Sequence, residues 1–193
     1  MRQFLLRLLV AATAALVFTA PAHAVGGNYD FAGGTAREQA QVRRALAAST
    51  FDWGVVPGRV AIHIAPGIDS HAVPGGIWLD ADLLRAGVFS WAVVQDEYAH
   101  QVDFLLFDEG TRALLNARLG GTAWCHGSRP GLDHAAYGCE RFASTLVWSF
   151  WPSRHNAYRP RTPRDEAGAM SPERFRALVR SVVSQRLAAF QAA

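Results

Sequence analysis

One long, mostly apolar segment constrains this chain more than any other feature. Residues Val88 to Phe107 carry apolar side chains on most sides of a helix, which predicts a helix buried on much of its circumference. Its apolar positions are Val88, Trp91, Ala92, Val94, Tyr98, Val102, Leu105 and Leu106. The polar or charged residues Gln95, Asp96, Glu97, His100 and Asp103 interrupt them. Because buried polar groups need partners, this helix is expected to carry a polar network or a bound ligand.

The spacing of these polar residues predicts a metal site. Asp96 and His100 are four residues apart, so they project from one face of a helix. Glu97 lies about 100° around the helix from Asp96. A metal ion held by Asp96 and His100 would lie close to Glu97, whose carboxylate could take a proton from a water on that metal. Asp103 is on the same side and is placed to accept a hydrogen bond from the imidazole of His100.

A second buried helix is predicted from about Asp133 to Phe150, and it supplies a candidate third ligand. Glu140 lies in this helix among apolar neighbours. A carboxylate on a buried helix is costly unless it is paired or bound to a metal. Glu140 is therefore a candidate ligand, and the alternative is a salt bridge with Arg141 or Arg112.

Together these two helices resemble the zincin metallopeptidases, specifically the gluzincin type. Val93 to Asp103 is similar to the family's V-x-H-E-x-x-H-x-x-D helix, with Asp96 at the position of the first histidine, and Glu140 to Ala143 is similar to its E-x-F-A helix. The resemblance implies a bound zinc ion and hydrolysis of peptide bonds. It implies Glu97 as the catalytic base and Asp96, His100 and Glu140 as the metal ligands. It also implies that Gly75 to Leu79 forms the edge strand above the cleft.

Asp96 is the departure from the family pattern. An aspartate binds zinc through oxygen, but its side chain is shorter than that of histidine. A ligand set of Asp, His and Glu also favours metals that accept oxygen, so another divalent cation is an alternative to zinc. Two carboxylates on the metal would make a bound water less acidic. His134 and His126 are candidates to replace the missing imidazole, and the alternative for each is a surface or capping histidine. If His134 is not a ligand, it is expected to lie beside the ligands.

Three functions remain open at this stage. The first is a metallohydrolase that acts on a peptide or protein substrate. The second is a catalytically inactive zincin-like domain used for binding or for a structural role, which the presence of Asp96 favours. The third is a metal-free hydrolase with paired carboxylates, as in glycosidases, using Asp96 or Glu97 with Glu140. No Gly-x-Ser-x-Gly motif supports a serine nucleophile.

The first 24 residues predict an exported protein. Arg2 and Arg7, a short apolar run and Ala22-His23-Ala24 have the layout of a signal peptide, which predicts a secreted or extracytoplasmic protein without stable membrane insertion after cleavage. Loss of this segment leaves 17 basic and 16 acidic residues, so the charge does not favour nucleic acid as a partner.

The only two cysteines, Cys125 and Cys139, are expected to form a disulfide. An even number of cysteines in an exported chain favours a disulfide over a pair of metal thiolates. Their spacing also differs from that of zinc-ribbon ligands.

The remaining segments predict one mainly helical, zincin-like α+β domain over residues 35–193, preceded by a flexible mature N-terminus over residues 25–34. A small sheet is expected to pack on the helix that carries Glu97 and His100. Its predicted strands are Arg59–Ile64, which alternates in hydrophobicity, and Ile77–Leu79. Further helices are predicted over residues 36–48, with a capping box of Thr35 and Glu38, over residues 112–119, and from Ser171-Pro172 onward.

Overall fold

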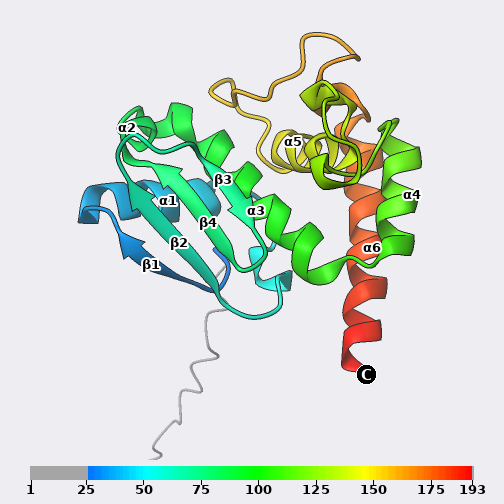
Figure 1. Cartoon of the computed structure of the whole chain (residues 1–193), viewed down its shortest axis with the longest axis horizontal. Helices are drawn as coiled ribbons and strands as arrows, with labels where there is room; N and C mark the ends of the chain where they lie inside the picture. The colour runs from blue at the N-terminus through cyan, green and yellow to red at the C-terminus, as the bar shows by residue number, and fades with distance from the viewer. Residues whose placement is uncertain (1–25, 193) are drawn as a thin grey trace, which may run out of the picture.

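A mixed four-stranded sheet forms one side of the protein in this computed structural model, which describes residues 26–192 (Figure 1). The strands are β1 (Tyr29–Gly33), β2 (Val60–Ala65), β3 (His71–Val73) and β4 (Gly76–Asp80). Their order in the sheet is β1-β2-β4-β3, in which β1, β2 and β4 are parallel and β3 is an antiparallel edge strand. The helices cover the other side, so the predicted α+β fold class is confirmed.

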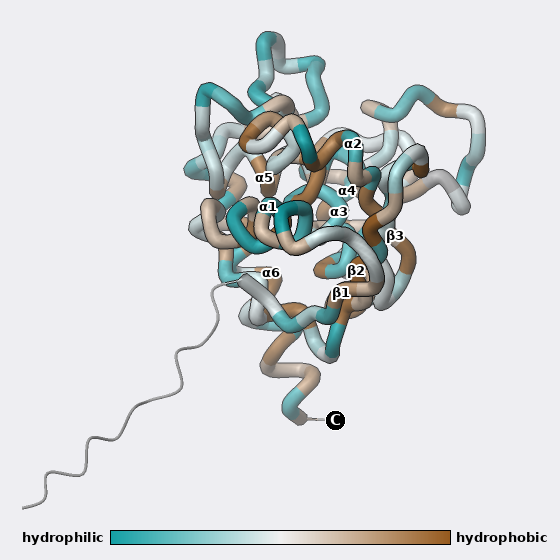
Figure 2. Tube along the Cα trace, turned by 90° about the vertical axis from the view of Figure 1, so that its left-hand side faces the viewer, coloured by the Kyte–Doolittle hydropathy of each residue, from teal (hydrophilic) through white to brown (hydrophobic). Residues whose placement is uncertain are grey.

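The strand β2 follows its predicted pattern. Val60, Ile62 and Ile64 are buried, whereas His63 lies on the opposite face and stacks on Trp78 of β4 with ring centroids 4.5 Å apart. This alternation is that of a strand whose one face meets the core. Figure 2 shows the apolar segments concentrated in the strands and inner helices, whereas the outer loops are hydrophilic.

Two predictions about the sheet are wrong. Residues 29–33 are not a flexible N-terminus, because β1 pairs in parallel with β2 and its Tyr29 and Phe31 pack against the core. The Gly75–Leu79 segment is not the edge strand, because β4 is bonded on both sides, to β2 and to β3. The edge strand beside the cleft is β3, His71–Val73. The sequence did not predict this strand because it is short and turn residues surround it.

The helices are α1 (Ala36–Ala48), α2 (Ala81–Leu84), α3 (Trp91–Leu106), α4 (Glu109–Leu119), α5 (Gly138–Phe150) and α6 (Pro172–Gln191). The predicted capping box of α1 is present: the Glu38 amide donates to Thr35 Oγ1 (3.3 Å) and the Thr35 amide to Glu38 Oε2 (2.7 Å). Helix α6 begins at Pro172 as predicted. No helix among residues 26–192 has the length and apolar character needed to cross a membrane. The predicted signal peptide, residues 1–24, lies outside the described residues.

Two predicted helices begin later than expected. The turn over Gly87–Ser90 is a 3₁₀ helix, and α3 starts at Trp91. The segment before α5 contains a 3₁₀ turn, His134–Ala136, and an extended Tyr137. The amides of Gly138 and Cys139 bond to carbonyls of the preceding loop, at Ala123 and Trp124 (both 2.8 Å), which sets the start of α5.

Helix α3 lies at the centre of the fold. It packs against α1, β3 and β4 on the sheet side and against α5 on the other side. Helix α5 in turn contacts α4 and α6 (Figure 1). The central position of α3 explains its broad apolar coverage, and it brings the face of α3 that meets α5 close to the edge strand β3.

Candidate metal centre

The buried polar residues of α3 separate into groups with different partners. Gln95 donates to the carbonyl of Ala45 in α1 (2.7 Å). Gln101 accepts from the Gly75 amide (2.8 Å) and donates to the Val73 carbonyl (2.9 Å), which fixes the turn between β3 and β4 against α3. These two glutamines therefore hold the helix against the sheet and are not part of the cleft.

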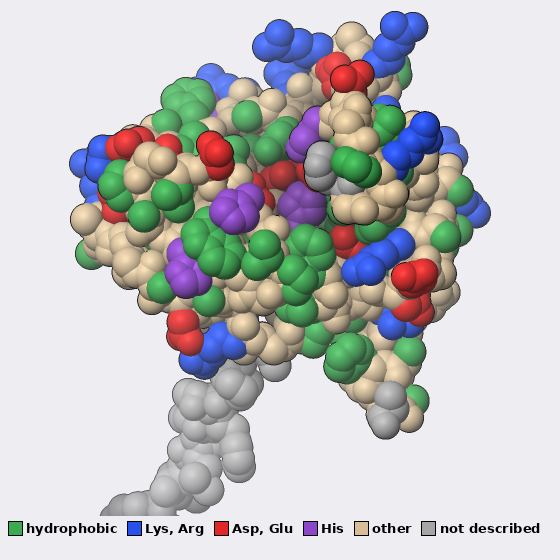
Figure 3. Space-filling model, viewed as in Figure 1, with side chains coloured by type: hydrophobic (Ala, Val, Ile, Leu, Met, Phe, Trp, Pro, Cys, Tyr) green, Lys and Arg blue, Asp and Glu red, His purple; other side chains and the backbone are tan. Residues whose placement is uncertain are grey.

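One face of α3 forms the floor of a cleft of about 500 Å³. Val93, Asp96, Glu97, His100 and Phe104 all line it. Residues at this spacing share one side of a helix. The opposite walls come from the edge strand β3 and from segments near α5, and Figure 3 shows histidine and acidic side chains gathered in this hollow.

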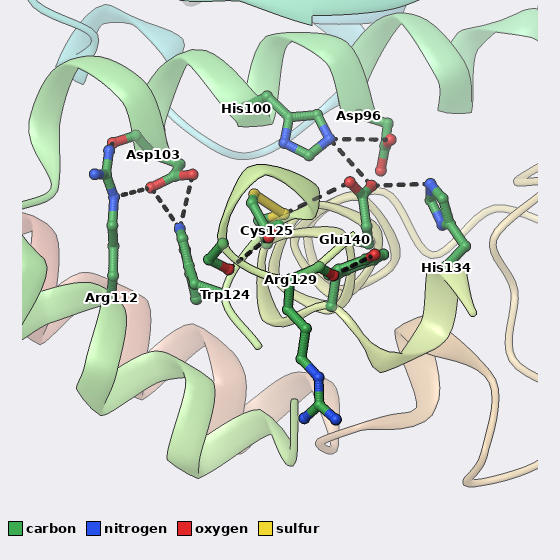
Figure 4. The surroundings of a disulfide bond; sticks show 12 residues. Asp96, His100, Asp103, Arg112, Trp124, Cys125, Arg129, His134 and Glu140 are labelled. Atoms are coloured by element: carbon green, nitrogen blue, oxygen red, sulfur yellow. Dashed lines mark hydrogen bonds and ion pairs between the residues drawn. A yellow bond between two sulfur atoms is a disulfide. The ribbon is translucent and has the colours of Figure 1, made fainter. Parts of the chain in front are cut away.

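The carboxylate of Glu140 lies between two imidazoles (Figure 4). Its Oε2 is 3.3 Å from His100 Nε2 and 3.2 Å from His134 Nε2. Glu140 is in the first turn of α5, and His134 is in the 3₁₀ turn just before it. The structure thus brings Glu140 to His100, as the two helices predicted, and adds His134 on the far side of the same carboxylate.

Neither arginine that was considered as a partner for Glu140 has that role. Arg112 pairs with Asp103 instead (2.7 Å). The guanidinium of Arg141 donates to the backbone carbonyls of Ala135 (2.6 Å) and Leu119 (3.2 Å).

Asp96 lies next to His100 in the same cleft. Its Oδ2 is 3.9 Å from His100 Nε2, and its Oδ1 accepts a hydrogen bond from Ser144 Oγ (3.4 Å). Ser144 Oγ shares its one proton between Asp96 and the nearer Glu166 Oε2 (3.0 Å), and Glu166 Oε1 is 2.7 Å from His134 Nδ1. A continuous polar ring therefore joins both helices with the segment that precedes α6.

Three residues of this site were missed from the sequence: Ser144, Tyr158 and Glu166. Ser144 is one helical turn after Glu140, which is the only local signal among them. Tyr158 and Glu166 come from a Pro- and Arg-rich segment that shows no periodicity. Burial and then the nearby carboxylates hold the pKa of Tyr158 well above its ordinary value, so the cleft keeps a phenolic hydroxyl as a hydrogen-bond donor.

The predicted hydrogen bond between Asp103 and His100 is absent. The Asp103 carboxylate instead accepts from Arg112 Nε (2.7 Å) and from Trp124 Nε1 (3.0 Å), as Figure 4 shows. Nδ1 of His100 has no hydrogen-bond partner among the residues that the structure describes. Asp103 joins α3 to α4 and to the loop after α4. The side chain of His126 lies outside the part of the chain that the structure describes.

Glu97 differs from the other carboxylates of the cleft. It is 8 % exposed and makes no hydrogen bond or ion pair to any other residue in the range 26–192. A buried carboxylate without a partner is costly in a fold whose other polar groups are satisfied. Glu97 is therefore the group in this cleft that is most available to a ligand or a reacting water.

The predicted disulfide between Cys125 and Cys139 is confirmed. It ties the loop after α4 to the first turn of α5, directly beside Glu140. Ligand atoms of His100, Cys139 and Glu140 all lie within 4.8 Å of one another and form a possible metal-binding group. Because the Cys139 sulfur is bonded to Cys125, it is not a thiolate, and His100 and Glu140 are the donors that the disulfide form offers.

We expect loss of this disulfide to destabilise the fold. In the chain-entropy model, a loop of about 15 residues contributes roughly 3 kcal/mol to the free energy of unfolding. Urea unfolding of the Cys125→Ala/Cys139→Ala variant should show a decrease of about that size. The natural protein under a dithiol reductant is the matched control and should show the same decrease. An unchanged urea midpoint after verified reduction would contradict the prediction.

In the metal-free protein, the pKa values of Asp96, Glu97 and His100 are all raised. Burial raises the pKa of Asp96 to about 7 and, together with Asp96, raises that of Glu97 to about 8. Burial alone would lower the pKa of His100, but the hydrogen bond to Glu140 and the surrounding carboxylates outweigh it and raise this pKa to about 9. The cleft therefore holds protons at neutral pH that a bound cation would displace.

These pKa values predict how the stability of the metal-free protein depends on pH. Each raised pKa means that the folded state binds the proton more tightly than the unfolded state. The contributions of Asp96 and Glu97 are full below about pH 4 and are lost as the pH rises through about 7 and 8. The contribution of His100 is full below its ordinary pKa of 6.5 and is lost as the pH rises through about 9.

We therefore expect the free energy of unfolding of the metal-free protein to fall by a few kcal/mol between about pH 5.5 and about pH 8.5. Urea unfolding with a chelator present measures this change. The Glu97→Gln variant is the control and should show a shallower decrease, because it lacks one of the titrating groups. A free energy of unfolding that is flat or rising over this range would contradict the assignment of the protons.

Comparison of the chain with known protein families, with curated proteins and with solved structures found no match. The resemblance to zincins stays a prediction, and a function has to be inferred from the cleft itself.

Proposed function

We propose that this protein is a metal-dependent hydrolase of peptide bonds. The observation that carries the proposal is the carboxylate of Glu97, which is buried, has no partner among the described residues and lies beside the His100–Glu140 pair in an open cleft. The resemblance to zincins assigns the same residue as the base.

The His100–Glu140 pair fits two ligand positions around a divalent cation. Ligand atoms around a tetrahedral zinc ion lie about 3.3 Å apart, since each bond is about 2.0 Å long. The separation of 3.3 Å between His100 Nε2 and Glu140 Oε2 agrees with this value. A third ligand would come from Asp96, at 3.9 Å from His100 Nε2, or from His134, at 3.2 Å from Glu140 Oε2. Each lies beside one member of the pair and forms no group with both in which all donor atoms are within 4.8 Å, so either side chain would have to move toward the cation.

The cation, Glu97 and Tyr158 would have different roles in hydrolysis. When bound, the cation supplies Lewis-acid activation of a water molecule and of the substrate carbonyl. Glu97 would accept the proton of that water, because its carboxylate has no other partner among residues 26–192. Tyr158 lines the same cleft and can donate a hydrogen bond to the substrate from its protonated hydroxyl.

A polypeptide fits the cleft better than a small substrate does. The residues Ser70, His71 and Ala72, at and before the edge strand β3, line the cleft. This strand pairs on one side only, with β4, within residues 26–192. An open strand edge beside a cleft binds an extended peptide through backbone hydrogen bonds.

A catalytically inactive, zincin-like binding domain is the second candidate function. Asp96 favours it, because carboxylates in place of an imidazole reduce the effective charge of the cation and make a bound water less acidic. The open edge of β3 would serve a binding function equally well.

The first experiment is measurement of the metal content of the purified protein by mass spectrometry, beside the His100→Ala variant. One divalent cation per chain, lost in His100→Ala and kept in the control His63→Ala, is the expected result. His63 is a suitable control because it lies on the outer face of the sheet, stacked on Trp78. Cleavage of quenched fluorescent peptides by the loaded protein then separates a hydrolase from an inactive domain. A protein that neither holds metal nor takes it up would overturn the proposal.

A further inference from the structure

A second hollow, of about 670 Å³, lies at the N-terminal end of α3 and is lined in part by the turn that precedes this helix. Its lining includes Phe89, which is four residues, or about one helical turn, before Val93 on the cleft floor. The loop after α5 also passes from one hollow to the other, since Tyr158 lines the cleft and Arg159 lines the second hollow. Segments directly continuous with two walls of the cleft thus border the second hollow, which places it beside the cleft.

The second hollow is basic. Arg154, Arg159, Arg161 and His155 line it, and none of the lining residues in the described part of the chain is acidic. Within residues 26–192, the guanidinium groups of Arg154 and Arg159 make no ion pair. Arg161 is partly offset by Asp165, whose carboxylate accepts from the Arg161 backbone amide (2.6 Å). Backbone hydrogen bonds from Arg161 and Thr162, and to a smaller extent the charge of Arg161, lower the pKa of Asp165. Figure 3 shows basic side chains over the loop that follows α5, above the cleft.

Arg154 donates to His155 Nε2 (3.1 Å), but neither Arg154 nor Arg159 has a carboxylate partner within residues 26–192, in contrast to two other arginines. Arg112 is satisfied by Asp103, and Arg186 by Asp108. Arg141 donates to backbone carbonyls. An arginine that lines a hollow without a carboxylate partner is available for an anionic ligand, which it can bind with two parallel hydrogen bonds.

The geometry points to a subsite in the second hollow that binds acidic side chains, aspartate or glutamate, of a polypeptide lying in the cleft. The inference rests on the proposed function, since it names the substrate class of that same cleft. Phe89, which is 61 % exposed and packs edge-on against His155 at 5.2 Å, offers an apolar wall for the methylene groups of such a side chain. Arg154 and Arg159 would bind its carboxylate.

The open edge of β3 argues for a polypeptide rather than a nucleic acid. His71 and Ala72 of this strand line the cleft, and within residues 26–192 the strand pairs only with β4. A nucleic acid has no row of amide donors and carbonyl acceptors that could pair with such an edge. A polypeptide places an uncharged backbone there and presents its acidic side chains only to the arginines.

Binding of labelled peptides tests this subsite independently of hydrolysis. The probe is a fluorescein-labelled peptide in which glutamate alternates with alanine, and the reference is the same peptide with glutamine at every glutamate position. Fluorescence anisotropy is measured on the full protein with a chelator present, so that no cleavage occurs. We expect the glutamate peptide to bind roughly tenfold or more tightly than the glutamine peptide.

The Arg154→Gln/Arg159→Gln variant should lose that preference, whereas Arg44→Gln/Arg118→Gln should keep it. The control removes the same charge from exposed positions that line neither hollow. Equal binding of both peptides by the natural protein would overturn the inference. An equal loss of the preference for the glutamate peptide in Arg154→Gln/Arg159→Gln and in the control Arg44→Gln/Arg118→Gln would also overturn it, because that result would indicate a nonspecific effect of net charge. A labelled single-stranded DNA that binds more tightly, with dependence on Arg154 and Arg159, would reassign the hollow to nucleic acid.

The outcome is distinguishable from failure of the proposed function. A protein that prefers the glutamate peptide but holds no metal would keep the acidic subsite and lose the hydrolase. A protein that binds metal and cleaves neutral peptides, without any preference for acidic ones, would keep the hydrolase and lose the acidic subsite.

Discussion

The Asp96→His variant should bind zinc at least about tenfold more tightly than the natural protein. Histidine at this position would lie four residues before His100 and complete the two-imidazole arrangement on one face of α3. The imidazole reaches farther than the aspartate side chain, and it adds a nitrogen donor of the kind that zinc prefers. The cleft of about 500 Å³ beside Asp96 provides room for the larger side chain.

Competition with a zinc-chelating dye measures the change in affinity, and circular dichroism checks that the variant is folded. Asp96→Asn is the matched control, because it keeps the size of the side chain and removes its charge. If Asp96 is the third ligand, Asp96→Asn should bind zinc more weakly than the natural protein. If His134 is the third ligand, Asp96→Asn should bind zinc as the natural protein does. An Asp96→His variant that folds and shows no gain in affinity would contradict the placement of the cation beside residue 96.

Local sequence signals correctly predicted those features of the fold and the cleft that depend only on residues close together in the sequence. Thr35 and Glu38 predicted the start of α1 because a capping box involves only one turn of helix. The alternation of Val60, Ile62 and Ile64 predicted β2 for the same reason. On α3, the spacing of Asp96, Glu97 and His100 predicted three cleft residues, since helix geometry alone places them together.

The sequence could not predict the features that depend on pairing between distant segments. Strands β1 and β3 are short, and turn or glycine residues flank them, so only their partners β2 and β4 define them as strands. Glu166 reaches His134 from a segment without periodicity, and nothing local marks it as a site residue. Asp103 had the spacing of a partner for His100, but Arg112 and Trp124 compete for its carboxylate and bind it instead.

The Glu97→Gln variant should lose hydrolysis of peptides by a factor on the order of 10² to 10⁴ while it keeps its metal. Glutamine has the size and shape of glutamate but cannot accept a proton from water. Glu97 is the carboxylate of the cleft that makes no hydrogen bond or ion pair within residues 26–192, so its substitution breaks no structural contact. The same substitution should stabilise the metal-free protein above neutral pH, because burial and Asp96 disfavour the ionised form of Glu97.

Steady-state cleavage of a fluorescent peptide, with the metal content measured on the same samples, separates a base from a ligand. Glu173→Gln is the control, because that glutamate is exposed on α6, and it should leave both quantities unchanged. Loss of activity with retained metal would establish Glu97 as the proton acceptor. Loss of both would make Glu97 a ligand, and the cation would then lie nearer to residue 97 than to Glu140. Unchanged activity would remove Glu97 from the reaction and leave the cleft as a binding site, because none of its other carboxylates is free of a hydrogen-bond or ion-pair partner within the described residues.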